Sequence, residues 1–155
     1  MSTVAGPTEG PYSVEDAQTS GVPRCQATVA NVATVEGFGY WSGKDVRVEF
    51  HPAEKDTGYI FVREDLKLPV SIPANVNFRM EMPRRTTLAR GGVQVEMVEH
   101  VLAALNGLGI TNCEIRVNQS EMPGCDGSSR AFVEAIDKVG IRPQNAWEPR
   151  LIVRE

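Results

Sequence analysis

Residues 95–108 read VEMVEHVLAALNGL, and this stretch decides much of the fold. Apolar side chains recur in it every three or four residues, which is the spacing of one face of an α-helix. The pattern predicts a helix whose core-facing stripe is formed by Val95, Val98, Val101, Leu102, Leu105 and Leu108.

The second face of this helix carries polar and small residues. At about 100° per residue, His100 lies almost opposite the apolar stripe and Glu99 lies on its flank. Glu96, Ala103, Ala104 and Gly107 share the side of His100, and the small residues among them allow another layer of protein or a ligand to come close to it. An adjacent Glu-His pair on such a face has two interpretations. Both side chains are simply solvated, or the glutamate is a general base beside a metal ligand.

The composition is ordinary for a globular protein of one domain. Of 155 residues, 41% are hydrophobic and 23% are charged. The 16 Lys and Arg against 20 Asp and Glu give a net charge of −4, which argues against a nucleic-acid backbone as the main partner. No apolar run approaches the length of a transmembrane helix.

Cysteine and histidine usage limits the chemistry further. Cys25, Cys113 and Cys125 are odd in number and have no CxxC spacing, which predicts a reducing, cytoplasmic compartment and no disulfide framework. His51 and His100 are the two histidines, so the chain cannot by itself supply a histidine-rich zinc site.

The part of the chain before the helix is expected to be a tail followed by strands. Residues 1–23 are rich in Gly, Pro, Ser, Thr and acidic residues, which predicts a disordered tail. Gly91 and Gly92 between two short apolar segments predict a tight hairpin that leads directly into the helix. The other expected strands are residues 25–35, 44–50, 59–63, 70–72 and 75–80.

After the helix, the pattern predicts one more strand and one more helix. Residues 112–118 alternate apolar with polar, and residues 130–139 carry a core stripe at helical spacing. Asp126 and Ser128 in the loop between them suit helix capping better than catalysis. Residues 142–149 are polar with two prolines and are expected to be a linker. The sum is an α+β fold, a two-layer sandwich of a mostly antiparallel sheet with two helices on one face.

Several motifs together resemble one enzyme family, the zinc-dependent UDP-3-O-acyl-N-acetylglucosamine deacetylases (LpxC) of lipid A biosynthesis. The resemblance extends from about Cys25 to Glu155, and its specificity comes from the order of the motifs. The matching segments are residues 37–43 (GFGYWSG), 51–53 (HPA), 56–58 (DTG), 72–74 (IPA), 98–105 (VEHVLAAL), 107–112 (GLGITN), 121–123 (EMP) and 126–128 (DGS).

The resemblance implies a division of the chain and roles for four residues. Members have two similar domains with the active site between their helical layers. This chain matches the first domain at residues 24–141, and residues 142–155 fit the linker and the start of a second domain. By the same resemblance, His100 is the zinc ligand of the first domain, Glu99 is the general base of amide hydrolysis, and Arg85 and Thr86 lie near the substrate.

The sequence also departs from the family pattern. The other zinc ligands and the general acid of the family belong to the second domain, so one Zn²⁺ ligand is recognisable in this chain. Trp41 stands where the glycine turn of the family usually has a histidine, Met97 stands in place of a threonine, and Gly124-Cys125 follows Pro123 in the later loop.

Two functions follow from these observations. The first is the N-terminal half of a zinc-dependent deacetylase, inactive alone, that acts on a UDP-acyl-glucosamine substrate once a second domain is supplied. The alternative is a non-catalytic relative that binds a ligand or a protein partner through the exposed helix face, including a second copy of itself. A homodimer would cover an otherwise exposed apolar patch. A folded domain with a vestigial Glu-His pair is the third interpretation.

Overall fold

The structure, a computed structural model, describes residues 24–148. The expected tail at residues 1–23 and the expected strand start at residues 151–153 lie outside the described residues. The described strands, in chain order, are β1 (Cys25–Val29), β2 (Ala33–Phe38), β3 (Asp45–Pro52), β4 (Tyr59–Arg63), β5 (Val70–Pro73), β6 (Arg79–Met80), β7 (Thr87–Arg90), β8 (Val93–Glu96), β9 (Cys113–Val117) and β10 (Ile141–Trp147). The helices are η1 (Val76–Phe78, a 3₁₀ turn), α2 (Glu99–Gly107) and α3 (Arg130–Val139).

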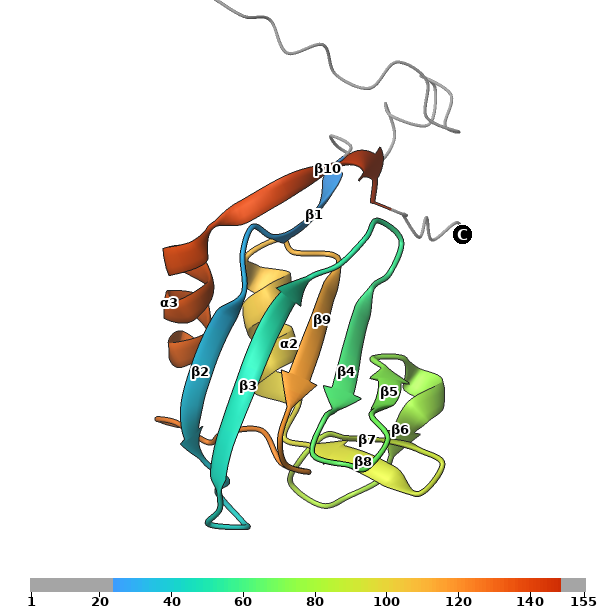
Figure 1. Cartoon of the computed structure of the whole chain (residues 1–155), viewed down its shortest axis with the longest axis vertical. Coiled ribbons are helices and arrows are strands. Elements are labelled where there is room, and N and C mark those ends of the chain that lie inside the picture. Colours follow the sequence, from blue (N-terminus) through green and yellow to red (C-terminus); the bar gives the residue numbers. More distant parts are fainter. Residues whose placement is uncertain (1–23, 149–155) are drawn as a thin grey trace, which may run out of the picture.

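The main sheet has five strands in the order β2-β3-β9-β4-β5. Neighbouring strands of this sheet pair antiparallel, except β4 and β9, which run parallel to each other. Both helices cover one face of this sheet, and the N-terminal ends of α2 and α3 lie at the same end of the molecule (Figure 1). The α+β sandwich expected from the sequence is confirmed.

The core lies between the sheet and the helices. Val46, Val48 and Phe50 of β3 are at most 2% exposed, whereas Arg47 between them is exposed, as the alternation of this strand predicts. The ring of Phe50 packs edge-to-face on Phe132 of α3, with centroids 6.0 Å apart. This packing fixes α3 against the sheet.

Two smaller sheets complete the described part of the molecule. β6, β7 and β8 form a three-stranded antiparallel sheet at one end, and β1 pairs with β10 in a ribbon at the other end (Figure 1). The hairpin turn between β7 and β8 is formed by Gly91 (φ 58°) and Gly92 (φ 79°), as the sequence predicts.

Helix α2 begins later than its apolar pattern suggests. Val95 belongs to β8, because the pairing of β8 with β7 continues to Glu96 opposite Thr87. Val95 is fully buried and helps to fill the core, but it does so from a strand. The expectation that Ala104 shares the open side of His100 is also wrong, since Ala104 is 2% exposed and faces the core.

Three further segments differ from the sequence expectations. Residues 25–35 form two strands, because β1 pairs with β10 whereas β2 pairs with β3 in the main sheet. Residues 75–80 contain the 3₁₀ turn η1 before the short strand β6. Residues 141–147, expected to be mostly linker, form β10, in which Pro143 faces Ala27 beside an irregularity in the pairing. An edge strand tolerates a proline and polar side chains, which is why the composition misled.

Candidate functional site

The Glu99-His100 pair lies where the chain turns sharply from β8 into α2. Met97 has a φ of 61°, a left-handed conformation that reverses the chain between the strand and the helix. Glu99 and His100 are then the first two residues of α2. A carboxylate in the first turn of a helix is stabilised by the free backbone N–H groups and the positive end of the helix dipole.

A backbone hydrogen bond holds the Glu99 carboxylate. The N–H of Thr86 donates to Oε2 of Glu99 at 3.0 Å, and the hydrogen-bonding atom of Thr86 is therefore on the backbone, not on the side chain. Both residues are half-buried. This bond fixes one carboxylate oxygen next to the strand that precedes the hairpin.

His100 is half-buried and is held through its backbone. Its carbonyl accepts a hydrogen bond from the hydroxyl of Ser129 at 2.9 Å, which joins the start of α3 to the start of α2. Among residues 24–148, none of the hydrogen bonds engages the imidazole ring. The ring is therefore not held by a hydrogen bond within the described part of the chain, and His100 directly follows Glu99 in α2.

Arg85 lies next to Thr86 and is enclosed by two side chains. Its Nε is 3.0 Å from Oε2 of Glu96, and the two side chains are 18% and 12% exposed. Its guanidinium carbon lies 5.2 Å from the centroid of the Trp41 ring, within the range of a cation–π contact.

The turn that carries Trp41 is held by the buried carboxylate of Glu121. The N–H of Trp41 donates to Oε1 of Glu121 at 2.8 Å, and the N–H of Ser42 donates to Oε2 at 2.9 Å. Gly39 is required here, because a Cβ on it would lie 2.5 Å from Oε2 of Glu121. Burial would raise the pKa of Glu121, but the hydrogen bonds from Trp41 and from Ser42 outweigh it and hold this pKa below its usual range.

The structure thus joins Thr86, the neighbour of Arg85, to Glu99, and it surrounds them with three residues to which the sequence analysis gave no role in the site. Glu96, Glu121 and Trp41 surround the predicted group, although Trp41 was noted only as a departure from a family pattern. The sequence contains a signal for Glu121, because it is a lone carboxylate beside the apolar pair Met122-Pro123 and does not belong to an alternating pattern of exposed polar residues.

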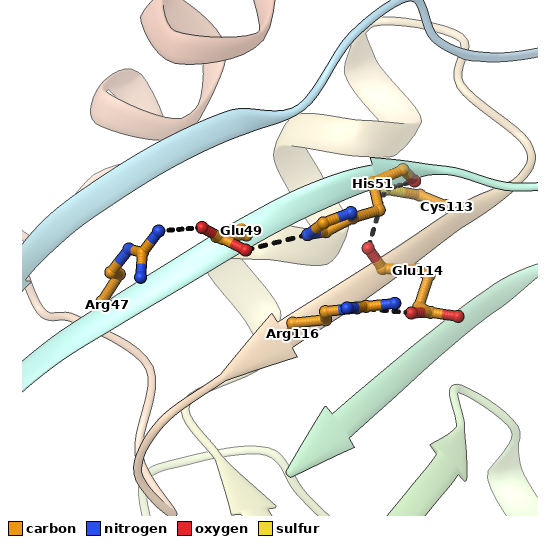
Figure 2. A network of polar contacts seen from close by, with 6 residues as sticks. All are labelled: Arg47, Glu49, His51, Cys113, Glu114 and Arg116. Carbon is orange, nitrogen blue, oxygen red and sulfur yellow. Dashed lines mark hydrogen bonds and ion pairs between the residues drawn. The ribbon is translucent and has the colours of Figure 1, made fainter. Parts of the chain in front are cut away.

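The two histidines lie on different elements, His51 on β3 and His100 on α2, and they do not share a site. His51 is on β3, where Nε2 is 2.9 Å from Oε2 of Glu49, on the sheet face opposite to the helices (Figure 2). The hydrogen bond from His51 and the nearby positive charges hold the pKa of Glu49 below its usual range despite partial burial. Arg47 of β3 and the Glu114–Arg116 pair of β9 continue this charged face.

The donor set around His100 does not complete a metal site within the described chain. A catalytic zinc ion takes three protein ligands and keeps one position open. In residues 24–148, no group of three or more His, Cys, Asp or Glu side chains is arranged to hold a metal ion. His100 with Glu99 is at most part of such a site.

The described residues include three cysteines and no helix that could cross a membrane. Cys25, Cys113 and Cys125 are free, and burial raises the pKa of the Cys113 thiol to about 12. The helices of residues 24–148 are all too short or too polar to cross a membrane.

Fold and site together define an α+β domain that presents a Glu-His pair at the start of one of its two helices. The chain belongs to the LpxC family, whose model, described as UDP-3-O-acyl N-acetylglycosamine deacetylase, matches residues 26–155. The resemblance stated from the motifs is confirmed. Members of this family are generally zinc-dependent.

Curated relatives show the same relationship. The chain is 40% identical over 130 residues to a UDP-3-O-acyl-N-acetylglucosamine deacetylase of Myxococcus xanthus, which covers 84% of this chain and 41% of the relative. It is 41% identical over 129 residues to the enzyme of the same name from Hahella chejuensis, covering 83% of this chain and 42% of the relative. A bifunctional enzyme LpxC/FabZ of Chlorobaculum tepidum is 41% identical over 130 residues, or 84% of this chain and 28% of the relative. The chain therefore spans less than half the length of these relatives.

Proposed function

We propose that this chain is the N-terminal half of a zinc-dependent deacetylase that hydrolyses the N-acetyl amide of a UDP-3-O-acyl-N-acetylglucosamine in lipid A biosynthesis. Membership of the LpxC family supports the reaction class. The observation that carries the proposal for this chain is the hydrogen bond from Thr86 N–H to Glu99, which fixes a carboxylate one residue before His100.

Glu99 is the general base in this proposal. One oxygen of its carboxylate is held by Thr86, and the other can take a proton from the attacking water as that water adds to the amide carbonyl. The C–N bond then breaks as the nitrogen takes up a proton from a general acid of the second domain, and acetate and the free amine leave. Zinc would lower the pKa of water and polarise the carbonyl. His100 would supply one of its ligands.

The remaining ligands must come from outside residues 24–148, because the described side chains supply one imidazole at this place. A second domain of the LpxC type fits this need, and the chain alone is then inactive. Three free cysteines suit a reducing compartment, so we place the protein in the cytoplasm.

The test is a chimera in which this chain replaces the matching 41% of the Myxococcus xanthus relative. Acetate release from UDP-3-O-acyl-N-acetylglucosamine is measured together with the zinc content. The Glu99→Gln variant should lose about 100-fold or more in kcat, the scale of general base catalysis, while retaining zinc. The His100→Ala variant should lose both zinc and activity.

The matched control is Glu114→Gln, because Glu114 lies on the outer sheet face in an ion pair with Arg116. This variant should keep the parent rate. A Glu99→Gln chimera that also keeps the parent rate would remove Glu99 from the mechanism.

A non-catalytic relative is the second candidate, and the exposure of two aromatic residues favours it. Tyr40 and Trp41 are 70% and 51% exposed on the turn between β2 and β3. A chimera that folds and binds zinc but releases no acetate would support this candidate. The mass of the isolated chain in solution would then show whether a second copy covers the surface.

A further inference from the structure

Arg85 contacts two side chains, Glu96 and Trp41, although its buried Nε makes no hydrogen bond with residues 24–148. Its Nε lies 3.0 Å from the carboxylate of Glu96, and its guanidinium lies under the ring of Trp41 at 5.2 Å. The side chain is 18% exposed. Binding of a substrate phosphate through Nε would have to break an ion pair that is itself mostly buried.

The two residues that hold Arg85 are themselves tied to one short segment. The N–H of Glu96 donates to the carbonyl of Ser120 at 2.7 Å, and the N–H of Met122 donates to the carbonyl of Glu96 at 3.0 Å. Between them, the carboxylate of Glu121 fixes the backbone of Trp41. The contacts therefore form a closed ring that passes from Glu96 through residues 120–122 and Trp41 to Arg85.

The residue after Arg85 is Thr86, whose backbone N–H donates to Glu99. A second bond, from the N–H of Val98 to the carbonyl of Thr86, completes the connection at 3.4 Å. The Thr86 peptide thus holds one oxygen of the Glu99 carboxylate. Arg85 directly precedes Thr86, so its contacts with Glu96 and Trp41 lie next to the peptide that carries this N–H.

We infer that Arg85 is a positioning residue, clamped between Glu96 and Trp41, that holds the Thr86 N–H in place to orient the Glu99 carboxylate. This role replaces the expectation that Arg85 binds substrate. It rests on the proposed function only in that Glu99 is taken as the base. The clamp itself is a property of this chain and can be tested without any reaction.

The first measurement uses the isolated chain and the amide proton of Thr86. An amide proton that donates to a carboxylate resonates further downfield in the NMR spectrum than one that donates to a neutral amide, because a bond to an ionised acceptor is stronger. In the parent, the Thr86 amide signal should show this downfield shift, and Glu99→Gln should abolish it. The Arg85→Met variant should lose most of it.

Control and rescue variants separate the clamp from general destabilisation. Arg116→Met removes an arginine whose Nε lies 2.7 Å from Glu114 on the outer sheet face, and it should leave the Thr86 shift intact. Arg85→Lys keeps a cation between Glu96 and Trp41 and should restore part of the shift. If Arg85→Met fails to fold, Trp41→Ala at a half-exposed position gives the same comparison, with a smaller expected loss.

The second measurement uses the chimera and separates kcat from KM. A positioning role predicts that Arg85→Met lowers kcat by about 10- to 100-fold with KM nearly unchanged, because a small misplacement of the base is enough. A substrate-binding role predicts a raised KM. Arg116→Met should change neither parameter.

The outcomes decide the inference in either direction. Loss of the Thr86 shift in Arg85→Met, with retention in Arg116→Met, supports the clamp. Retention of the shift in Arg85→Met, together with a raised KM, overturns it and returns Arg85 to the substrate. If the parent chimera releases no acetate, the proposed function fails, and the NMR comparison still decides whether Arg85 positions Glu99.

Discussion

Two polar clusters lie at opposite ends of the described molecule, and they are built differently. At the end of the β1–β10 ribbon, Asn112 is 1% exposed, and its side chain is hydrogen-bonded to Gln26, Gln144, Thr111 and the N–H of Gly58. At the other end, Glu99 and His100 are half-buried, and the ring of His100 makes no hydrogen bond within residues 24–148. Figure 1 shows the ribbon and the β6–β8 sheet at opposite ends.

The difference separates a structural cluster from a functional one. The amide of Asn112 uses its donors and its acceptor within the domain, which stabilises the junction of several loops. At the other end, the hydrogen bond from Thr86 engages one oxygen of the half-buried Glu99 carboxylate. Changes at the first end should therefore alter stability, and changes at the second should alter chemistry.

The largest stability effect is expected at the first end. Asn112→Ala leaves the N–H of Gly58 and the side-chain carbonyl of Gln144 unpaired at a partly buried place, whereas the carbonyl of Gln26 still accepts the N–H of Asp56. The free energy of unfolding should fall by about 2–4 kcal/mol, since each buried group left unpaired costs about 1–3 kcal/mol. Urea unfolding followed by circular dichroism measures this change.

The matched control for this prediction is Asn118→Ala. The side chain of Asn118 accepts one hydrogen bond, from the N–H of Arg47, at a more exposed place. This variant should cost about 1 kcal/mol or less. Equal losses at Asn112 and Asn118 would contradict the view that the first cluster is a buried, fully paired network.

The sequence predicted the elements whose signals are local. Residues 130–139 form α3 with the expected bounds, but its N-cap is Ser129 without a side-chain capping bond, and Ser128, one residue earlier, accepts the N–H of Arg130. The alternation of β3 and the Gly91-Gly92 turn are equally local. In each case, the residues that carry the signal are also the residues that make the contact.

Elements that depend on a distant partner were predicted less well. β10 is polar and contains Pro143, and it is a strand because β1 pairs with it. The start of α2 was misplaced because Val95 and Val98 are both buried and extend the helical spacing across the end of β8. Neither the strand β10 nor the start of α2 can be predicted from the local sequence pattern.

The site shows the same limit. The Glu99-His100 pair and its neighbours Arg85 and Thr86 were identified by resemblance to a family, and the structure joins Thr86, the neighbour of Arg85, to Glu99, although it does not test their roles. The role of Glu121 in holding the turn was not predicted, because its partners Trp41 and Ser42 lie about 80 positions earlier in the chain. A contact of that kind depends on two loops meeting, which composition and spacing do not encode.

An intermediate effect is expected at Glu121, and it should depend on pH. Glu121→Gln keeps one acceptor oxygen and loses the charge-assisted bond to the other N–H of the turn, which should cost about 1–2 kcal/mol at neutral pH. The pKa of Glu121 in the folded chain lies below its ordinary value of 4.5. Its contribution is therefore complete above that value and is lost as the pH falls through the lowered folded pKa.

The stability gap between the parent and Glu121→Gln should consequently narrow when urea unfolding is repeated at a pH of about 3. Asp65 and Glu49 also have lowered pKa values, but they are common to both proteins and cancel in the difference. Glu134→Gln, at an exposed ion pair with Arg130, serves as the control and should change little. A gap that stays constant with pH would show that the charge of Glu121 does not hold the turn.

The smallest effect compares one substitution at the two ends. Thr87 is fully buried beside Glu96, and its hydroxyl has no hydrogen-bond partner among residues 24–148. Thr28, equally buried at the ribbon end, accepts the N–H of Ala53 at 3.0 Å. Thr87→Val should be neutral or stabilising by up to about 1 kcal/mol, whereas Thr28→Val should destabilise by about 1–3 kcal/mol.

Thermal or urea unfolding of Thr87→Val and Thr28→Val measures the change in stability that each substitution causes. Valine has nearly the shape of threonine, so the difference between the two variants reports the hydroxyl and not the packing. If Thr87→Val costs as much as Thr28→Val, the Thr87 hydroxyl has a partner in solution. The end that contains Glu99 would then be as fully paired as the ribbon end, and the contrast between a structural and a functional cluster would have to rest on Glu99 and His100 alone.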